Sequence, residues 1–183
     1  PSGQFRGCGI WSLESGDRLM IVIDERVYHV DLPRGVFVPC ATLATAAGTC
    51  HFTQADRFMI LQDSVSDPVV FEENDAGEVV ETSHAVSLPR GYFGIYAHGR
   101  IHMVPTKVPS TDVSGKPYLV SGDVMEPLNP ETVLQATETE YLSEGGAHGL
   151  PLEMGFIGGL GVLRNAHTGT GLGSVIAFAR HGV

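Results

Sequence analysis

The feature of this sequence that most constrains its fold is a string of residue types that occurs twice. Gly16–Asp24 reads GDRLMIVID, and further along the chain Ala55–Asp63 reads ADRFMILQD. After each string the chain crosses a short polar break and returns in a second apolar run, at Val27–Val30 and at Pro68–Phe71. Two short apolar runs on either side of a polar turn predict a β-hairpin, so each copy is expected to form one.

A looser third copy follows after a similar interval. Its apolar runs are Gly91–Tyr96 and Ile101–Val104, on either side of a break at 97–100. Hairpins about 40 residues apart are typical of β-propellers, because one four-stranded blade takes roughly 40–45 residues. The tetrapeptide LPRG also occurs twice, at Leu32–Gly35 and Leu88–Gly91, and is expected where one blade passes to the next.

These patterns predict a mainly β fold, a propeller-like array of antiparallel hairpins. The hairpins at 17–31 and 56–71 are expected to occupy equivalent positions in successive blades. The 23 glycines and 11 prolines suit a chain of short strands and many turns. One short helix is expected near 130–144, where Asn129 suits the N-cap and Pro130 the first helical position.

The chain is expected to form one domain. Residues 1–183 contain 43% hydrophobic and 17% charged residues, which is the composition of a globular domain. The last residues, 173–183, read as a strand, a turn and the start of a return. We therefore expect a single β-rich domain that is a segment of a larger propeller protein.

Net charge and hydropathy indicate whether the chain binds nucleic acid or spans a membrane. The formal net charge is -10, which argues against a nucleic-acid-binding surface because such a surface needs clustered lysine and arginine. The charge suits a conduit that DNA passes without binding. Since no apolar run reaches the roughly 18 residues of a membrane span, no span is expected.

Few residues suggest chemistry. His98 and His102 have a metal-ligand spacing, but a strand-turn-strand would hold them too far apart for easy chelation. Cys50 and His51 are adjacent and would point to opposite faces of a strand, which argues against a catalytic pair. Gly169–Gly173 resembles half of a phosphate-binding loop but precedes a strand, so a flexible turn is favoured. The three cysteines, Cys8, Cys40 and Cys50, lack metal spacing and are expected to be buried free thiols.

No catalytic, cofactor-binding or metal residue is therefore assigned, and no cofactor is expected. After the third hairpin, Pro105–Pro117 reads as a long loop containing proline, serine and lysine. Such a loop is a candidate for contacts with neighbouring subunits.

Several segments, taken in order, resemble a family of bacteriophage virion proteins, the large tail or connector components with β-propeller cores. The segments are Gln54–Asp63, Ile95–Ile101, Ser121–Val124, Thr137–Gly146 and Leu150-Pro151. In one place the chain departs from that family, which tends to have a glycine after Gln62-Asp63 where Ser64 stands here.

The resemblance implies a structural subunit of the virion without catalytic activity, similar in role to tail nozzle or tubular proteins. Such subunits form homo-oligomeric rings with other virion subunits around the path by which DNA leaves the capsid. They are assembled in the host cytoplasm, and DNA passes them without sequence-specific binding.

Two alternatives stay open at this point. The first is a propeller module that binds a glycan or a receptor, whose mark would be clustered Trp and Tyr. The chain has one Trp and five Tyr. The second is a metal-dependent β-barrel enzyme that uses His98 and His102.

Overall fold

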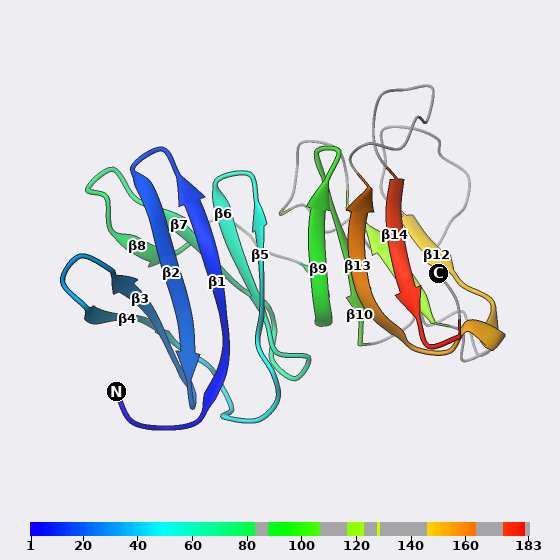
Figure 1. Ribbon diagram of the computed structural model, residues 1–183, viewed down its shortest axis with the longest axis horizontal. Coiled ribbons are helices and arrows are strands. Elements are labelled where there is room, and N and C mark those ends of the chain that lie inside the picture. The colour runs from blue at the N-terminus through cyan, green and yellow to red at the C-terminus, as the bar shows by residue number, and fades with distance from the viewer. Residues whose placement is uncertain (83–87, 107–116, 123–127, 129–145, 164–173, 182–183) are drawn as a thin grey trace.

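The computed structural model describes residues 1–82, 88–106, 117–122, 128, 146–163 and 174–181. These residues form four antiparallel sheets that follow one another along the chain (Figure 1). The first three sheets have four strands each, and the fourth has two. The prediction of a mainly β fold is confirmed, and the described residues contain no α-helix. The helix predicted near 130–144 lies outside them.

In each of the first three sheets, neighbouring strands along the chain pair with one another. The strands of the first sheet are β1 (Phe5–Leu13), β2 (Gly16–Ile23), β3 (Arg26–Asp31) and β4 (Val36–Thr42). Those of the second are β5 (His51–Ala55), β6 (Phe58–Gln62), β7 (Val69–Glu73) and β8 (Val79–Glu81). Those of the third are β9 (Gly91–Ala97), β10 (Arg100–Pro105), β11 (Tyr118–Ser121) and β12 (Gly146–Gly149), and those of the fourth are β13 (Ile157–Leu163) and β14 (Ser174–Ala179). A single turn of 3-10 helix at Leu152–Met154 precedes β13.

The turns between the first and second strands of the sheets recur with a regular period. Each is a two-residue turn, and the turns begin at Glu14, Asp56 and His98. The interval from Glu14 to Asp56 equals the interval from Asp56 to His98. Asp56 and His98 both have left-handed backbone, with φ of 54° and 56°. The first three sheets therefore repeat one structural unit.

The recurring sequence string does not have the same period as this structural unit. Both copies contribute to second strands, β2 and β6, as expected. Asp56, however, is the first residue of its turn, whereas Asp17 lies in the strand, three positions beyond the equivalent Glu14. An odd shift reverses the face of every side chain. The predicted equivalence of the hairpins at 17–31 and 56–71 is therefore wrong in register. The third copy is out of phase as well, since 91–104 forms the first and second strands of its sheet.

The LPRG tetrapeptides also differ in place. Leu88–Gly91 leads into β9 on the connection from the second sheet to the third, so this copy does lie between two repeating units, as predicted. Leu32–Gly35 instead forms the turn between β3 and β4 inside the first sheet, so that prediction is wrong. The LPRG sequence suits the turn between β3 and β4 because proline fixes one backbone dihedral and glycine allows a positive φ, which Gly35 has at 63°.

Two hydrophobic clusters hold the sheets face to face. The cluster between the first and second sheets includes Trp11, Met20, Met59, Leu61 and Phe71. The cluster between the second and third sheets consists mainly of Ala55, Phe58, Ile60, Val70, Ile101, Met103 and Val120. Strand β6 is buried along its whole length because its alternate side chains enter the two clusters.

The sheets are arranged so that their first strands are neighbours. Figure 1 shows β1, β5, β9 and β13 side by side across the molecule, and each contacts the next. The first sheet lies at one end of the long axis and the fourth toward the other. Of the predicted contact loop at 105–117, residues 107–116 lie outside the described residues, as does the glycine-rich segment 169–173.

Candidate functional site

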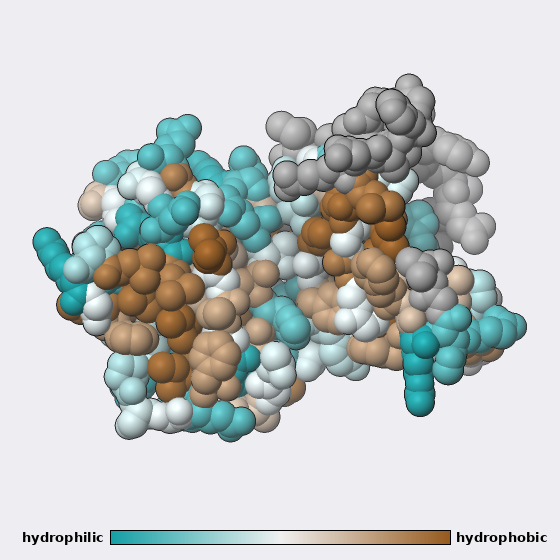
Figure 2. Space-filling model, viewed as in Figure 1, coloured by the Kyte–Doolittle hydropathy of each residue, from teal (hydrophilic) through white to brown (hydrophobic). Residues whose placement is uncertain are grey.

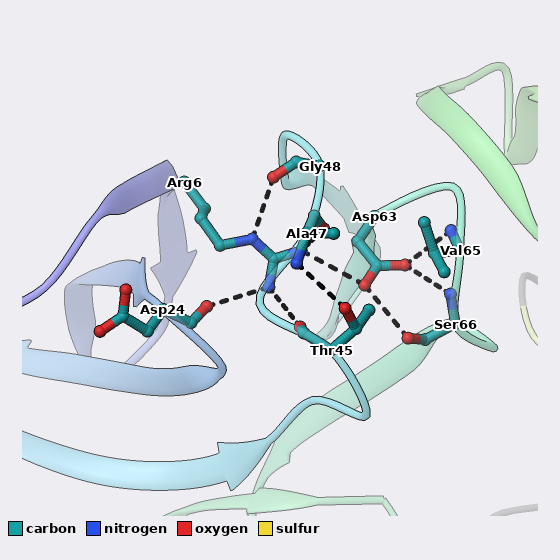
Figure 3. A network of polar contacts seen from close by, with 8 residues as sticks. All are labelled: Arg6, Asp24, Thr45, Ala47, Gly48, Asp63, Val65 and Ser66. Atoms are coloured by element: carbon teal, nitrogen blue, oxygen red, sulfur yellow. Dashed lines mark hydrogen bonds and ion pairs between the residues drawn. The ribbon is translucent and has the colours of Figure 1, made fainter.

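The most extensive polar network of the described residues surrounds a buried arginine (Figure 3). Arg6 lies on β1, and its guanidinium donates to the backbone carbonyls of four residues in other segments. The acceptors are Gly48 from Nε at 2.9 Å, Asp24 and Thr45 from one terminal nitrogen at 2.9 and 2.7 Å, and Ala47 from the other. Because three of these carbonyls belong to the connection between the first two sheets, Arg6 fixes that connection against β1.

The same guanidinium forms an ion pair with Asp63, which follows β6. The nearest nitrogen and oxygen are 3.4 Å apart, and the two side chains are only 1% and 2% exposed. Asp63 Oδ1 also accepts from the backbone amides of Val65 and Ser66, and Oδ2 from the Ser66 hydroxyl. These bonds satisfy both charges, so the pair is built as a structural clamp between the first and second sheets.

The turn that follows Asp63 places a residue other than glycine in the left-handed region. Ser64 has a positive φ of 66°. The two amide bonds to the Asp63 carboxylate hold the turn together, so a non-glycine residue keeps the left-handed conformation.

A close joint connects β1 to β5. The Cβ of a side chain at Gly7 would lie 2.1 Å from the Cys50 carbonyl oxygen, and that at Gly9 would lie 2.5 Å from the Phe52 Cβ. At one end of the joint the Cys50 amide donates to the Arg6 carbonyl at 2.9 Å. Only glycine allows two backbones to approach so closely.

The other end of this joint is closed by an amide side chain. Gln54 on β5 accepts from the Ser12 amide at 2.9 Å and donates to the Ser12 carbonyl at 2.7 Å. The side chain thus takes the place of a strand partner for one residue of β1. Sequence reasoning missed Arg6, Gly7 and Gly9, because a partner in a different sheet leaves no local pattern.

The joint between β5 and β9 has the same character. The Thr53 hydroxyl donates to the Gly94 carbonyl at 3.0 Å, and a Cβ at Gly91 would lie 2.5 Å from the Gln62 side-chain nitrogen. Gln62 is buried, so the missing side chain on β9 leaves room for it. At the next joint, Tyr92 packs edge-on against Phe156 at 5.1 Å between ring centroids.

The two histidines with metal-ligand spacing do not come together as ligands. His98 is an exposed turn residue, whereas His102 is half-buried on β10 and bonds through Nδ1 to the Ser121 hydroxyl at 2.8 Å. Burial is the main cause that lowers the pKa of His102 to about 4. In the part of the chain that the structure describes, no three His, Cys, Asp or Glu side chains are grouped to hold a metal ion.

The three cysteines are free thiols, as predicted, but the prediction that all are buried is wrong, since only Cys50 is. Cys8 is exposed, and Cys50 is buried in the cluster between the first two sheets. Burial raises the pKa values of Cys40 and Cys50 to about 11, which keeps both thiols protonated and unreactive at neutral pH. The ring of His51 packs against Phe93 of β9, at 5.6 Å between centroids, and Cys50 points to the first sheet.

Comparisons of the chain with protein-family models, with curated proteins and with solved structures found no match. Among the described residues, no helix is long and apolar enough to cross a membrane. The candidate functional features of the described residues are the clamp of Arg6 and Asp63 and the close contacts that hold successive sheets together.

Proposed function

We propose that this chain is a structural subunit of a bacteriophage particle. Its sheets are successive blades of a β-propeller, and the subunit belongs to a tail nozzle, tubular or connector ring around the DNA exit path. The observation that carries the proposal is the row of first strands. From sheet to sheet these strands lie side by side, and the turns that follow the first three of them, β1, β5 and β9, recur at equal intervals along the chain. A propeller is built by this repetition, with the first strands of its blades around a central channel.

The contacts at these joints support a mechanical role. The buried ion pair of Arg6 and Asp63, the glycines of β1 and the Gln54 side chain all serve to fix one sheet on the next. A subunit of a pressurised conduit needs such rigid connections. The segments that resemble phage tail and connector proteins add the biological context.

The charge of the chain supports the same role. With a net charge of -10, the chain repels the phosphate backbone on average, so DNA moves past it without being retained. In this proposal the subunit binds other virion subunits and copies of itself, and it needs no cofactor. It resides in the virion.

Antibody labelling of the particle tests the proposal. An antibody raised against the purified chain should label purified particles of the encoding phage at the tail or at the vertex where the tail meets the head, as seen by electron microscopy. Antibody absorbed beforehand with the purified chain is the control. If the antigen is found in the soluble lysate and particles remain unlabelled, the proposed role is wrong.

A further inference from the structure

The outer face of the first sheet is a broad apolar surface. Strand alternation places a set of side chains on the face opposite to the one that packs on the second sheet. The set consists of Cys8, Ile10, Leu19, Ile21 and Phe37, and it includes Ile10, which is 66% exposed. Figure 2 shows hydrophobic atoms gathered over this end of the molecule. We name this surface the leading face.

The fourth sheet, in the half of the molecule away from the first sheet, also has an apolar face (Figure 1). Phe178 is 49% exposed, and its ring lies over Gly161, where a Cβ would be 3.2 Å from the ring. Leu163, on the same face as Gly161, is 53% exposed. Figure 2 shows a second gathering of hydrophobic atoms over β13 and β14. We name this surface, made of Leu163, Ile176 and Phe178, the trailing face.

The internal repeat shows what the leading face is built to contact. Ile10 pairs with Leu19 across the ladder, and in the next repeat Phe52 pairs with Leu61 in the same position. Phe52 and Leu61 belong to the cluster between the first and second sheets. The leading face is therefore the equivalent of a surface that, one sheet later, is covered by the sheet before it.

The trailing face points in the opposite direction along the stack of sheets. The second sheet turns one face to the sheet before it and one to the sheet after it, and the fourth sheet contacts the third through β13 and β9. Its exposed face thus points in the direction in which a next sheet would lie. Since the first and fourth sheets lie apart along the long axis, with the other two sheets between them, these faces do not meet within one molecule (Figure 1).

We propose that the leading face of one copy packs on the trailing face of a second copy, head to tail. The inference deepens the proposed function, on which it rests for its biological setting. Both faces are apolar, and they point in opposite directions along the stack of sheets. One heterologous contact between two copies therefore covers both faces and continues the stacking of sheets from copy to copy. Contacts of this type close into rings or extend into filaments.

The native thiol of Cys8 reports on this contact, because it is the exposed cysteine and its neighbour across the ladder is Ile21 of the leading face. The test is the rate of maleimide labelling of Cys8 in the full chain at increasing protein concentration, together with the mass by sedimentation. We expect labelling to slow by about fivefold or more over a hundredfold rise in concentration, in step with the growth of oligomers. Labelling that does not depend on concentration would overturn the proposal.

Variants at each end identify the partner surface. Ile10→Asp and Phe178→Asp should each restore fast labelling of Cys8 at high concentration, although Phe178 belongs to the fourth sheet. The matched control is Leu152→Asp, at a residue that is 54% exposed and belongs to neither face. Ile10→Ser and Phe178→Ser, each checked by circular dichroism, serve if an aspartate variant does not fold.

If Ile10→Asp restores labelling and Phe178→Asp does not, two leading faces meet, and the head-to-tail contact is wrong. This result would leave the structural role intact, because particle labelling tests that role separately. Conversely, unlabelled particles combined with head-to-tail oligomers in solution would reject the virion role and keep the interface.

Discussion

The guanidinium of Arg6 and the carboxylate of Asp63 are 3.4 Å apart and almost completely buried, although the residues belong to different sheets. Each has further hydrogen bonds, so the pair is fully satisfied. The free-energy cost of breaking such a pair exceeds the gain from making it, because the remaining charge is left buried without a partner. The clamp therefore couples the first sheet, the connection after it and the second sheet into one unit.

Replacement of Arg6 should strongly destabilise the chain. Arg6→Met keeps much of the length of the side chain and removes all its donors, so we expect a loss of about 3–5 kcal/mol in the free energy of unfolding. Urea denaturation measures the change. The control is Arg34→Met, since Arg34 is 80% exposed in its ion pair with Asp31 and should change stability by less than about 1 kcal/mol. Equal effects of the two substitutions would show that the clamp has no special role.

The close joint between β1 and β5 should reject any side chain at Gly7. In Gly7→Ala the new methyl group would lie 2.1 Å from the Cys50 carbonyl oxygen, so the strands must separate at a cost of roughly 1–3 kcal/mol. Gly158→Ala is the matched control, because its Cβ would meet nothing closer than 3.9 Å. Thermal unfolding of the two variants compares them, and a Gly7→Ala protein as stable as Gly158→Ala would refute the account of the joint.

Strand β6 should be the least tolerant of charge. Met59 and Ile60 are 1% and 0% exposed and enter different clusters, so an aspartate at either position is buried without a partner. The cost of several kcal/mol is comparable to the roughly 5–15 kcal/mol that stabilises a domain, and we expect both variants to be unfolded by circular dichroism. Leu32→Asp, in an exposed turn, should fold normally. Folded Met59→Asp and Ile60→Asp proteins would mean that β6 is not central.

His102 should make stability depend on pH. Its pKa is about 4 in the folded chain and about 6.5 when unfolded, so the unfolded state binds more protons between these values. Stability therefore falls as pH is lowered through this window, by on the order of 2 kcal/mol between pH 7 and pH 5. His29 and His51, whose pKa values are also lowered, contribute in the same direction.

The variant His102→Gln measures how much of this pH-dependent loss of stability is due to His102, because the glutamine amide can still bond to Ser121. Chemical denaturation at pH 7 and pH 5 should show a smaller loss of stability in the variant than in the unchanged chain. An identical loss in both proteins would assign the pH dependence to other groups.

The sequence predicted the class of fold because strand and turn patterns are local. It could not predict the register, as Met20 and Met59 illustrate. They hold the same place in the recurring string, yet they lie on opposite faces of their sheets and meet in one cluster. The true period depends on turns of different composition, at Glu14, Asp56 and His98.

The clamp and the joints could not be predicted for a related reason. Arg6, Gly7 and Gly9 have ordinary neighbours in the sequence, and their roles depend on Cys50, Phe52 and Asp63 in another sheet. Local patterns contain no information on such partners. The apolar outer residue Ile10 was likewise indistinguishable from a core residue until the stacking of the sheets showed which face is open.

The most direct test of the central claim is a cryo-electron microscopy map of the intact phage particle at a resolution that separates strands. The account predicts that the sheets of residues 5–42, 51–81 and 91–149 appear as neighbouring blades of one propeller. Several symmetry-related copies of the chain should surround the path of the DNA. A map in which these sheets are not neighbouring blades, or in which the chain occupies no position in the particle, would contradict it.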